Sequence, residues 1–171
     1  MLKKVALAAA ASAALFSNAA LAGSASGTLN VTATITAACT FGTNSPIAFG
    51  SVLTTSSVTN NAGSLDITCT NLLPYTVSVD DGQNHDATAV LPSHGRRMKD
   101  SSGNFLMYEV YTDTGRTSIA DSVAANNTFD TPGFGAGTGT NQAITIYGQI
   151  PVQTTPGAAS FSDQLSLTVN F

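Results

Sequence analysis

Two cysteines, Cys39 and Cys69, are the residues with the most definite chemistry in this sequence of 171 residues. Such a pair is either oxidised to a disulfide or shared by a metal ion. The metal site is the weaker alternative, because neither a third cysteine nor a histidine at ligand spacing completes the set. We expect one disulfide, because two cysteines in an exported domain are typically paired.

A turn-rich stretch gathers both histidines and three of the aspartates: Asp80, Asp81, His85, Asp86 and His94. The histidines have neither the i,i+4 spacing nor the His-x-His spacing of common metal sites. The aspartates surround Gly82 but lack the spacing and the final glutamate of an EF-hand calcium loop. We therefore expect neither a metal nor another cofactor.

Groups for catalysis are scarce, since only 9% of the residues are charged and Glu109 is the one glutamate. They assemble neither a Ser–His–Asp triad nor a carboxylate pair, so we expect no enzyme. A net charge of −4 excludes a nucleic-acid partner, because phosphate affinity comes from Lys and Arg. The cations Arg96, Arg97 and Lys99 are interpreted as a solvated turn, with a minor role against an acidic neighbour as the alternative.

The first 22 residues have the pattern of a secretory signal peptide. Lys3 and Lys4 precede an apolar run from Val5 to Phe16, and the small residues Ala20 and Ala22 form a cleavage site before Gly23. A membrane anchor is the alternative, but the uncharged stretch Val5–Ala22 is mostly alanine, too weakly apolar and barely long enough to span a bilayer. Cleavage leaves four basic and ten acidic residues, a net charge of −6.

The elements that must position the remaining residues are strands. Apolar and polar residues alternate in five segments: Leu29–Ile35, Leu65–Cys69, Tyr75–Val79, Ile144–Ile150 and Leu165–Phe171. This period of two predicts half-buried strands. Met107–Tyr111 is a further candidate strand.

Turn residues separate these segments, at Gly42–Pro46, Thr59–Ser64, Asp80–Asn84 and Thr131–Asn141. Short strands with frequent turns and no alternation with helices predict a single antiparallel β-sandwich. Termini usually fray, but here both ends have a strand pattern, which indicates that both are built to be paired.

The order of several motifs resembles one known family. These are Leu29–Ile35 followed by Cys39, Leu65–Cys69, Tyr108–Asp113 leading to Arg116–Thr117, Ile146–Pro151 and Leu167–Phe171. From about Gly27 to Phe171 the chain is similar to the spore coat protein U domain, the pilin family of archaic (Csu-type) chaperone–usher pili. The resemblance implies an incomplete immunoglobulin-like antiparallel β-sandwich that lacks its seventh strand and is completed by a donor strand from a neighbouring subunit.

The same resemblance assigns roles along the chain. Residues 23–36 would be the donor segment, and residues 37–171 the pilin domain. The donor side chains would be Leu29, Val31, Ala33 and Ile35, of which Ala33 is small for such a position. The edge of the groove, which also binds the chaperone, would be the C-terminal strand with Leu165, Leu167, Val169 and Phe171.

The implied partners are a periplasmic pilus chaperone, an outer-membrane usher and identical or related pilin subunits. The implied function is that of a shaft subunit of a surface pilus of a Gram-negative bacterium, exported through the periplasm, that supports adhesion and biofilm formation. A tip adhesin would need a second domain, for which 149 residues after cleavage leave no room. The alternative is a secreted β-sandwich of this family that stays non-polymeric or binds a ligand such as a carbohydrate, although the chain has no tryptophan for a sugar platform.

Overall fold

The computed structural model describes residues 23–53, 58–88, 94–124 and 127–171. The chain divides into two units, Met1–Thr34 and Ile35–Phe171. The signal peptide expected over residues 1–22 lies outside the described residues. Residues 23–34 of the first unit form neither helix nor strand, and all their side chains are exposed. In the described part of the chain, we find no helix with the length and apolar character needed to cross a membrane.

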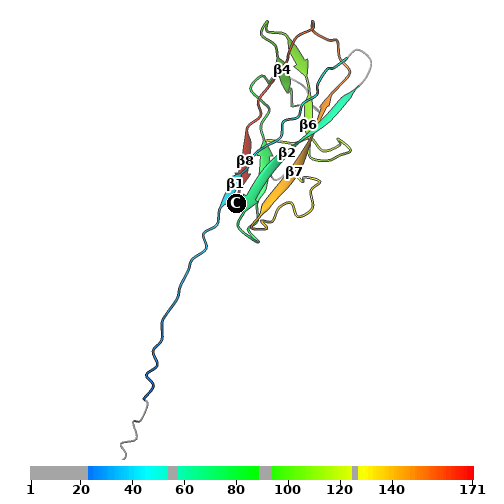
Figure 1. Ribbon diagram of the computed structural model, residues 1–171. Helices are drawn as coiled ribbons and strands as arrows, with labels where there is room; N and C mark the ends of the chain where they lie inside the picture. The colour runs from blue at the N-terminus through cyan, green and yellow to red at the C-terminus, as the bar shows by residue number, and fades with distance from the viewer. Residues whose placement is uncertain (1–22, 54–57, 89–93, 125–126) are drawn as a thin grey trace, which may run out of the picture. The chain divides into compact units, whose positions relative to one another are not determined.

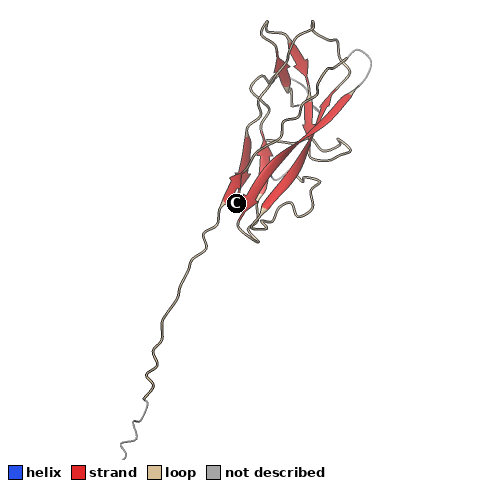
Figure 2. Ribbon diagram, in the orientation of Figure 1, coloured by secondary structure: helices blue, strands red, loops and turns tan. Residues whose placement is uncertain are grey.

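The described residues form eight strands and no α-helix (Figure 1, Figure 2). Their bounds are β1 Cys39–Phe41, β2 Thr59–Cys69, β3 Thr76–Val79, β4 Arg97–Lys99, β5 Phe105–Met107, β6 Glu109–Tyr111, β7 Asn141–Ile150 and β8 Leu167–Asn170. One sheet has the order β1-β2-β7-β6, while β3 pairs with β8 and β4 pairs with β5. Every pairing is antiparallel, which confirms the expected all-β antiparallel class.

The long antiparallel pair β2–β7 is the floor of the domain. Its register runs from Thr59 opposite Ile150 to Thr68 opposite Asn141. Because side chains of a strand alternate between faces, one face of the pair carries a continuous apolar row. The row consists of Leu65, Ile67, Ile144, Ile146 and Ile150, all buried.

The pair β3–β8 supplies the opposing layer of a β-sandwich. Val77 and Val79 of β3 are fully buried and belong to the same core cluster as the apolar row of β2 and β7. On β8, Leu167 and Val169 point the same way but are only half-buried against this core. The core is therefore closed over β3 and less completely closed over β8.

Two sequence-based boundaries are wrong. Thr59–Ser64, interpreted as a turn, is the first half of β2, because its backbone continues the ladder with β7. Met107–Tyr111, interpreted as one strand, is divided between β5 and β6, which belong to different sheets. The break falls at Tyr108, whose backbone N–H donates to Arg96 O at 3.1 Å.

The solvated turn expected at Arg96, Arg97 and Lys99 is also wrong, since Arg97 and Lys99 lie on β4 and Arg96 is 0% exposed. The Arg96 guanidinium pairs with the carboxylate of buried Glu109. It also donates to the carbonyls of Asp80 and Ala120, both at 2.8 Å. Burying a charge is costly unless it is paired and fully hydrogen-bonded, and these partners meet that condition.

This network gives a prediction with a matched control in the next residue. Arg96→Met leaves the Glu109 carboxylate buried without its partner and should lower the free energy of unfolding by about 3–5 kcal/mol. Arg97→Met removes a half-exposed guanidinium that pairs with Asp86 and lies over the Phe105 ring, so its effect should be much smaller. Urea unfolding of both variants measures the difference, and equal losses would contradict the assignment of Arg96 to the core.

Candidate functional site

The candidate site is a groove between two edges of the sandwich. In the described residues, β1 is paired only with β2, and β8 only with β3. Inward-facing apolar residues near these two edges are half-buried, whereas those of β2, β3 and β7 are buried. The half-buried set is Cys39, Phe41, Ile47, Phe49 and Val52 on one side and Phe161, Leu165, Leu167 and Val169 on the other.

One wall of the groove is the segment from Ser45 to Phe49, which follows β1. Its outer side is tied to β2, because Ser45 and Ser64 exchange backbone hydrogen bonds at 2.9 and 3.1 Å and Asn61 Nδ2 donates to Ala48 O. The side chains of Ile47 and Phe49 turn inward and line the groove.

The opposite wall is the segment from Phe161 to Leu167, which leads into β8. Its even-numbered residues are tied outward: Ser162 exchanges backbone hydrogen bonds with Lys99, and Ser166 O accepts from Asp80 N at 3.0 Å. Successive backbone groups of an extended strand point to opposite edges. Those of Asp163 and Leu165 therefore point toward the groove.

Two adjoining clefts make up the groove. One, of about 560 Å³, lies between the walls over Leu65 and Ile146 of the floor. The other, of about 720 Å³, lies beyond it near Leu53, Leu106 and Ile150. The two share four lining residues, which makes them one channel: Ile47, Phe49, Met98 and Phe161.

Two glycines let the first wall lie close to the floor. A Cβ atom on Gly148 of β7 would stand 2.5 Å from Ile47 Cγ2 and 2.8 Å from Phe49 Cζ. A Cβ atom on Gly63 of β2 would stand 2.6 Å from Ser45 O. Any larger residue at these positions would displace the wall, so the glycines set the depth of the groove on this side.

A polar pair interrupts the apolar lining at mid-groove. Tyr108 OH donates to Asp163 Oδ2 at 2.6 Å, and Asn84 Nδ2 donates to Asp163 Oδ1 at 2.8 Å. Burial raises the pKa of the Tyr108 hydroxyl, and its hydrogen bond to Asp163 raises the pKa further. Tyr108 therefore stays a proton donor at physiological pH and holds Asp163 in the wall.

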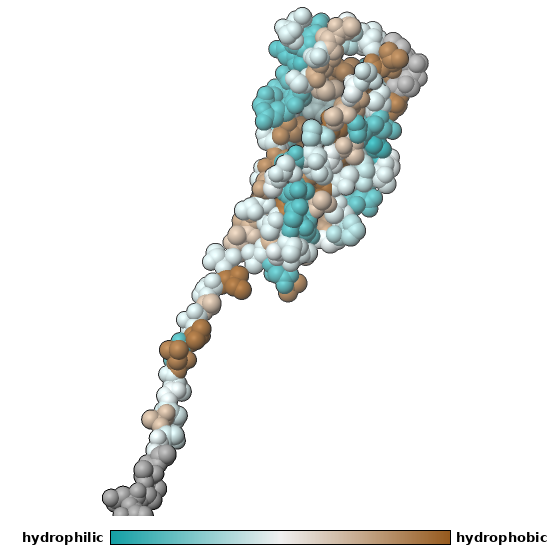
Figure 3. All heavy atoms as spheres, viewed as in Figure 1, coloured by the Kyte–Doolittle hydropathy of each residue, from teal (hydrophilic) through white to brown (hydrophobic). Residues whose placement is uncertain are grey.

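The structure brings together part of the set predicted from the sequence. Leu165, Leu167 and Val169 are among the half-buried residues beside the groove, while Phe171 lies outside β8 and is 60% exposed. Of the expected donor residues, Leu29 is 89%, Val31 86% and Ile35 86% exposed, and Ala33 is exposed too. Figure 3 shows brown apolar side chains recurring along this segment. Of the expected cleavage site, Ala22 lies outside the described residues and Gly23 is exposed.

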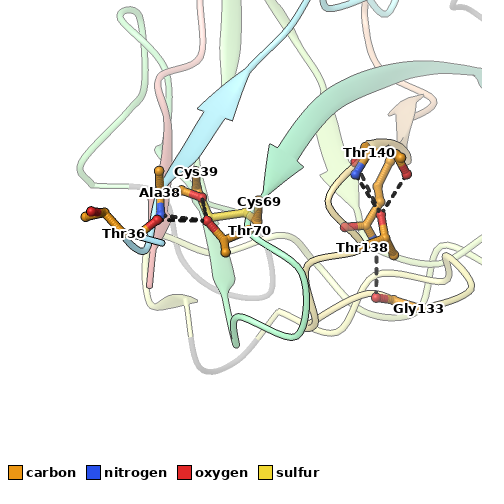
Figure 4. The surroundings of a disulfide bond; sticks show 9 residues. Thr36, Ala38, Cys39, Cys69, Thr70, Gly133, Thr138 and Thr140 are labelled. Atoms are coloured by element: carbon orange, nitrogen blue, oxygen red, sulfur yellow. Dashed lines mark hydrogen bonds between the residues drawn. A yellow bond between two sulfur atoms is a disulfide. The ribbon is translucent and has the colours of Figure 1, made fainter. Parts of the chain in front are cut away.

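The expected disulfide between Cys39 and Cys69 is present and joins directly opposed residues of β1 and β2 (Figure 4). Beside it, Thr70 N donates to Ala38 O at 2.9 Å, and Ala38 N donates to Thr70 Oγ1 at 3.1 Å. The Thr70 hydroxyl also donates to Thr36 O at 3.3 Å. These bonds continue the β1–β2 register and fix the backbone that leads into β1.

The histidines and aspartates of the turn-rich stretch have other contacts. His94 Nδ1 lies 2.8 Å from Asp81 Oδ1, while His85 Nδ1 lies 3.1 Å from Gly82 O. Among the residues that the structure describes, no three His, Cys, Asp or Glu side chains are grouped for a metal ion.

Sequence reasoning missed the first wall and the mid-groove pair. Ile47, Phe49 and Phe161 lie in short segments beside Pro46 and Pro156, where alternation is too brief to indicate a strand. The signal that could have found the wall is the glycine pair Gly63 and Gly148, each inside an otherwise continuous strand, where glycine often marks a close approach of another backbone.

The comparison with known families accounts for nearly the whole described chain. Residues 25–168 match the Spore Coat Protein U domain. The chain belongs to this family. The match includes the exposed segment Leu29–Ile35, both cysteines and both walls of the groove.

A solved structure has a similar fold to this Spore Coat Protein U domain. It is the crystal structure of the CsuC–CsuE chaperone–tip adhesion subunit pre-assembly complex from archaic chaperone–usher Csu pili of Acinetobacter baumannii. The match has a TM-score of 0.55 and 18% identity, covers 81% of this chain and spans 40% of the matched chain. At this identity the likeness concerns the fold alone. No curated protein matches the chain.

Substitution of Gly148 tests the account of the first wall. Gly148→Val should push Ile47 and Phe49 outward and lower the free energy of unfolding by about 1–3 kcal/mol, the usual cost of overpacking. Gly157→Val is the control, because a Cβ atom there has no neighbour within 4 Å. Urea unfolding of the two variants decides the matter, and a Gly148→Val domain as stable as the control would contradict the close approach.

Proposed function

We propose that this chain is a structural subunit of a chaperone–usher surface pilus that polymerises by donor-strand exchange. In this proposal residues 37–171 form an immunoglobulin-like sandwich that lacks one strand, and residues 23–36 are the strand given to a neighbour. The observation that carries the proposal is the apolar groove between the Ser45–Phe49 and Phe161–Leu167 walls, whose inward-facing residues are half-buried.

The groove lacks backbone partners for one sheet edge and cover for its half-buried apolar side chains, and an added strand would supply both. Its backbone would pair with the groove-facing groups of Asp163 and Leu165, each bond contributing about 0.5–1.5 kcal/mol. Its inward side chains would complete the burial of Leu65 and Ile146 on the floor and of the half-buried walls. A loop or a small ligand would not supply a regular row of backbone partners.

The exposed segment Leu29–Ile35 has the properties required of such a strand. Its apolar residues fall on one face and Asn30, Thr32 and Thr34 on the other. Leu29, Val31 and Ile35 would each contribute about 1.5–3 kcal/mol on full burial, before the cost of ordering the segment.

Possession of both a groove and a donor segment favours the shaft over the tip. A subunit inside a fibre must accept one strand and give another, whereas a terminal subunit needs only one of these functions. This chain carries both parts, so we place it in the shaft, exported to the cell surface, with a structural and not an enzymatic role.

The proposed partners follow from the same groove. Until a neighbour fills it, the apolar lining must be covered, and a periplasmic chaperone that inserts its own strand would do so before an outer-membrane usher exchanges it. The similar Acinetobacter baumannii protein is described in a complex of chaperone and tip adhesion subunit, which supports a chaperone as the first partner.

The donor role is tested by two substitutions on adjacent residues. Val31→Asp would place a charge without a partner in the neighbour's groove, at a cost of several kcal/mol, and should abolish fibres. Thr32→Asp places the same charge on the outward face and should leave fibres intact. Chaperone complex and surface polymer are measured side by side, with the chaperone complex expected at wild-type level for both variants.

Three outcomes would contradict this role. If Val31→Asp loses the chaperone complex as severely as it loses fibres, Leu29–Ile35 belongs to its own domain. If neither variant changes the polymer, Leu29–Ile35 is not the donor segment. If the wild-type chain forms no polymer with its chaperone and usher, the protein is a non-polymeric member of the family.

A second prediction concerns the unfilled groove. Expressed alone in the periplasm, the chain should aggregate or be degraded, because a sheet edge and an apolar groove stay exposed. Co-expression with the chaperone should restore soluble protein. Because self-insertion of residues 23–36 would also give a soluble monomer, the deletion of these residues is the control. A soluble, cooperatively melting monomer after that deletion would show a closed sandwich.

A further inference from the structure

The turn from Thr70 to Leu73 presents an exposed leucine in an unfavourable backbone conformation. Leu72 has φ 62° and is 79% exposed. Among the described residues other than glycine, only Arg116 shares a positive φ. The Arg116 side chain, unlike that of Leu72, is bound to the sheet, because its guanidinium donates to Gly148 O and Asn61 O. Leu72 combines two unfavourable features, positive φ and an exposed apolar side chain.

The backbone around Leu72 is held firmly. Leu73 N donates to Thr70 O at 3.0 Å and closes the turn, while Leu72 N donates to Gly137 O at 2.7 Å. Gly137 lies so close to Thr70 O that a Cβ atom there would collide with it. These backbone hydrogen bonds therefore fix the direction of the Leu72 Cα–Cβ bond, and the side chain is exposed.

Leu72 belongs to the end of the domain at which residues 36–38 join β1. We name this the disulfide end, defined by Cys39, Cys69 and the turn Thr70–Leu73. Figure 4 shows Thr36 and Ala38 beside Thr70 at this end. The opposite end of the β2–β7 pair, where Thr59 faces Ile150, is named the Ile150 end. The nine residue steps from Ile150 to Asn141 separate these ends by about 30 Å.

The following inference rests on the proposed function. The connection between the proposed donor segment and β1 is short. If Ile35 is the last residue inserted into a neighbour, only Thr36, Ala37 and Ala38 precede Cys39. Four residue steps span at most about 14 Å. The disulfide end of the donor subunit must therefore lie against the mouth of the neighbour's groove.

Fibre geometry selects which mouth this is. Each subunit releases its donor segment at its own disulfide end. If that segment left the acceptor at the acceptor's disulfide end as well, like ends would meet and the subunits would crowd together. A linear fibre requires the junctions at opposite ends, so the donor strand leaves its acceptor at the Ile150 end.

The Ile150 end has an apolar cleft that the donor strand does not fill. A strand of seven residues spans about 20 Å, the length of the Phe161–Leu167 wall, whereas the lining of the second cleft reaches back to Thr155. The cleft near Leu53 and Ile150 therefore extends past the strand, and none of its lining residues is charged. Residues 70–73 are also uncharged.

We propose that Leu72 of one subunit packs into the Ile150-end cleft of the next copy of this chain, against Leu53 and residues 155–161. The contact makes the junction between subunits stiffer than the three connecting residues alone would. As an apolar contact it is insensitive to ionic strength.

The test places a photocrosslinking amino acid, benzoylphenylalanine, at position 72 of the full chain, expressed with its chaperone and usher. Irradiated fibres should give a covalent dimer whose linked peptide comes from residues 47–53 or 155–161. The control carries the same amino acid at position 123 and should give no such peptide. Val123 is exposed and lies two residues after Asp121, whose backbone carbonyl accepts from Val79 N.

A second variant covers the case in which the bulky reagent blocks assembly. Leu72→Asn suits the positive φ and removes the apolar contact. The subunit in its chaperone complex should therefore melt at a higher temperature, while the fibres have a shorter persistence length by electron microscopy. That loss should be the same at low and high salt. Fibres that form but crosslink elsewhere, or Leu72→Asn fibres as stiff as wild type, overturn the contact and leave the proposed function standing. Failure of the wild-type chain to form fibres overturns both.

Discussion

The unpaired edges of the sandwich are the constraint on which the rest of the structure depends. An edge strand leaves half of its backbone groups without partners in the sheet. Here two such edges lie on either side of the apolar face of the β2–β7 pair. Unpaired backbone groups and incompletely buried apolar side chains therefore occur together in one groove. The outer sides of both walls are well bonded, to Ser64 and Asn61 of β2 on one side and to Asp80 and Lys99 on the other. The deficit is therefore confined to the side that faces the groove.

The buried Arg96 supports the Phe161–Leu167 wall, which leads into β8. Its guanidinium binds Asp80 O, and the Asp80 carboxylate accepts from Ser166 N at 2.8 Å. The same guanidinium pairs with Glu109 of β6, which also accepts from His94 N. One cation thus links β3, β6 and the approach to β8 without help from the groove. Such a link explains how the wall can keep its position while its inner face is still uncovered.

Alternation in the sequence was sufficient to predict the strands that bury one face, such as β3 and most of β7. Two cysteines in a chain expected to be exported were sufficient to predict the disulfide. Arg96 could not be predicted, because in sequence it looks like its exposed neighbour Lys99, and its burial depends on Glu109 thirteen positions later. The break at Tyr108 was hidden for a similar reason. Its alternation fits a strand, but its hydroxyl is committed to Asp163, far away in the chain. The wall at Ile47 depends on Gly148, another contact between distant residues.

The structure around Thr70 and the disulfide affects whether the proposed donor segment could enter the groove of its own subunit. Insertion in the subunit's own groove from the disulfide end would need residues 36–38 to reverse the chain next to β1. Thr36 O and both backbone groups of Ala38 are instead bonded to Thr70, in register with the β1–β2 pair. A reversal would break these bonds beside a disulfide that holds Cys39 in place. Insertion into a neighbour keeps them. Under the proposed donor role, the disulfide and Thr70 therefore disfavour insertion of residues 23–36 into the subunit's own groove and leave this segment available to a second copy.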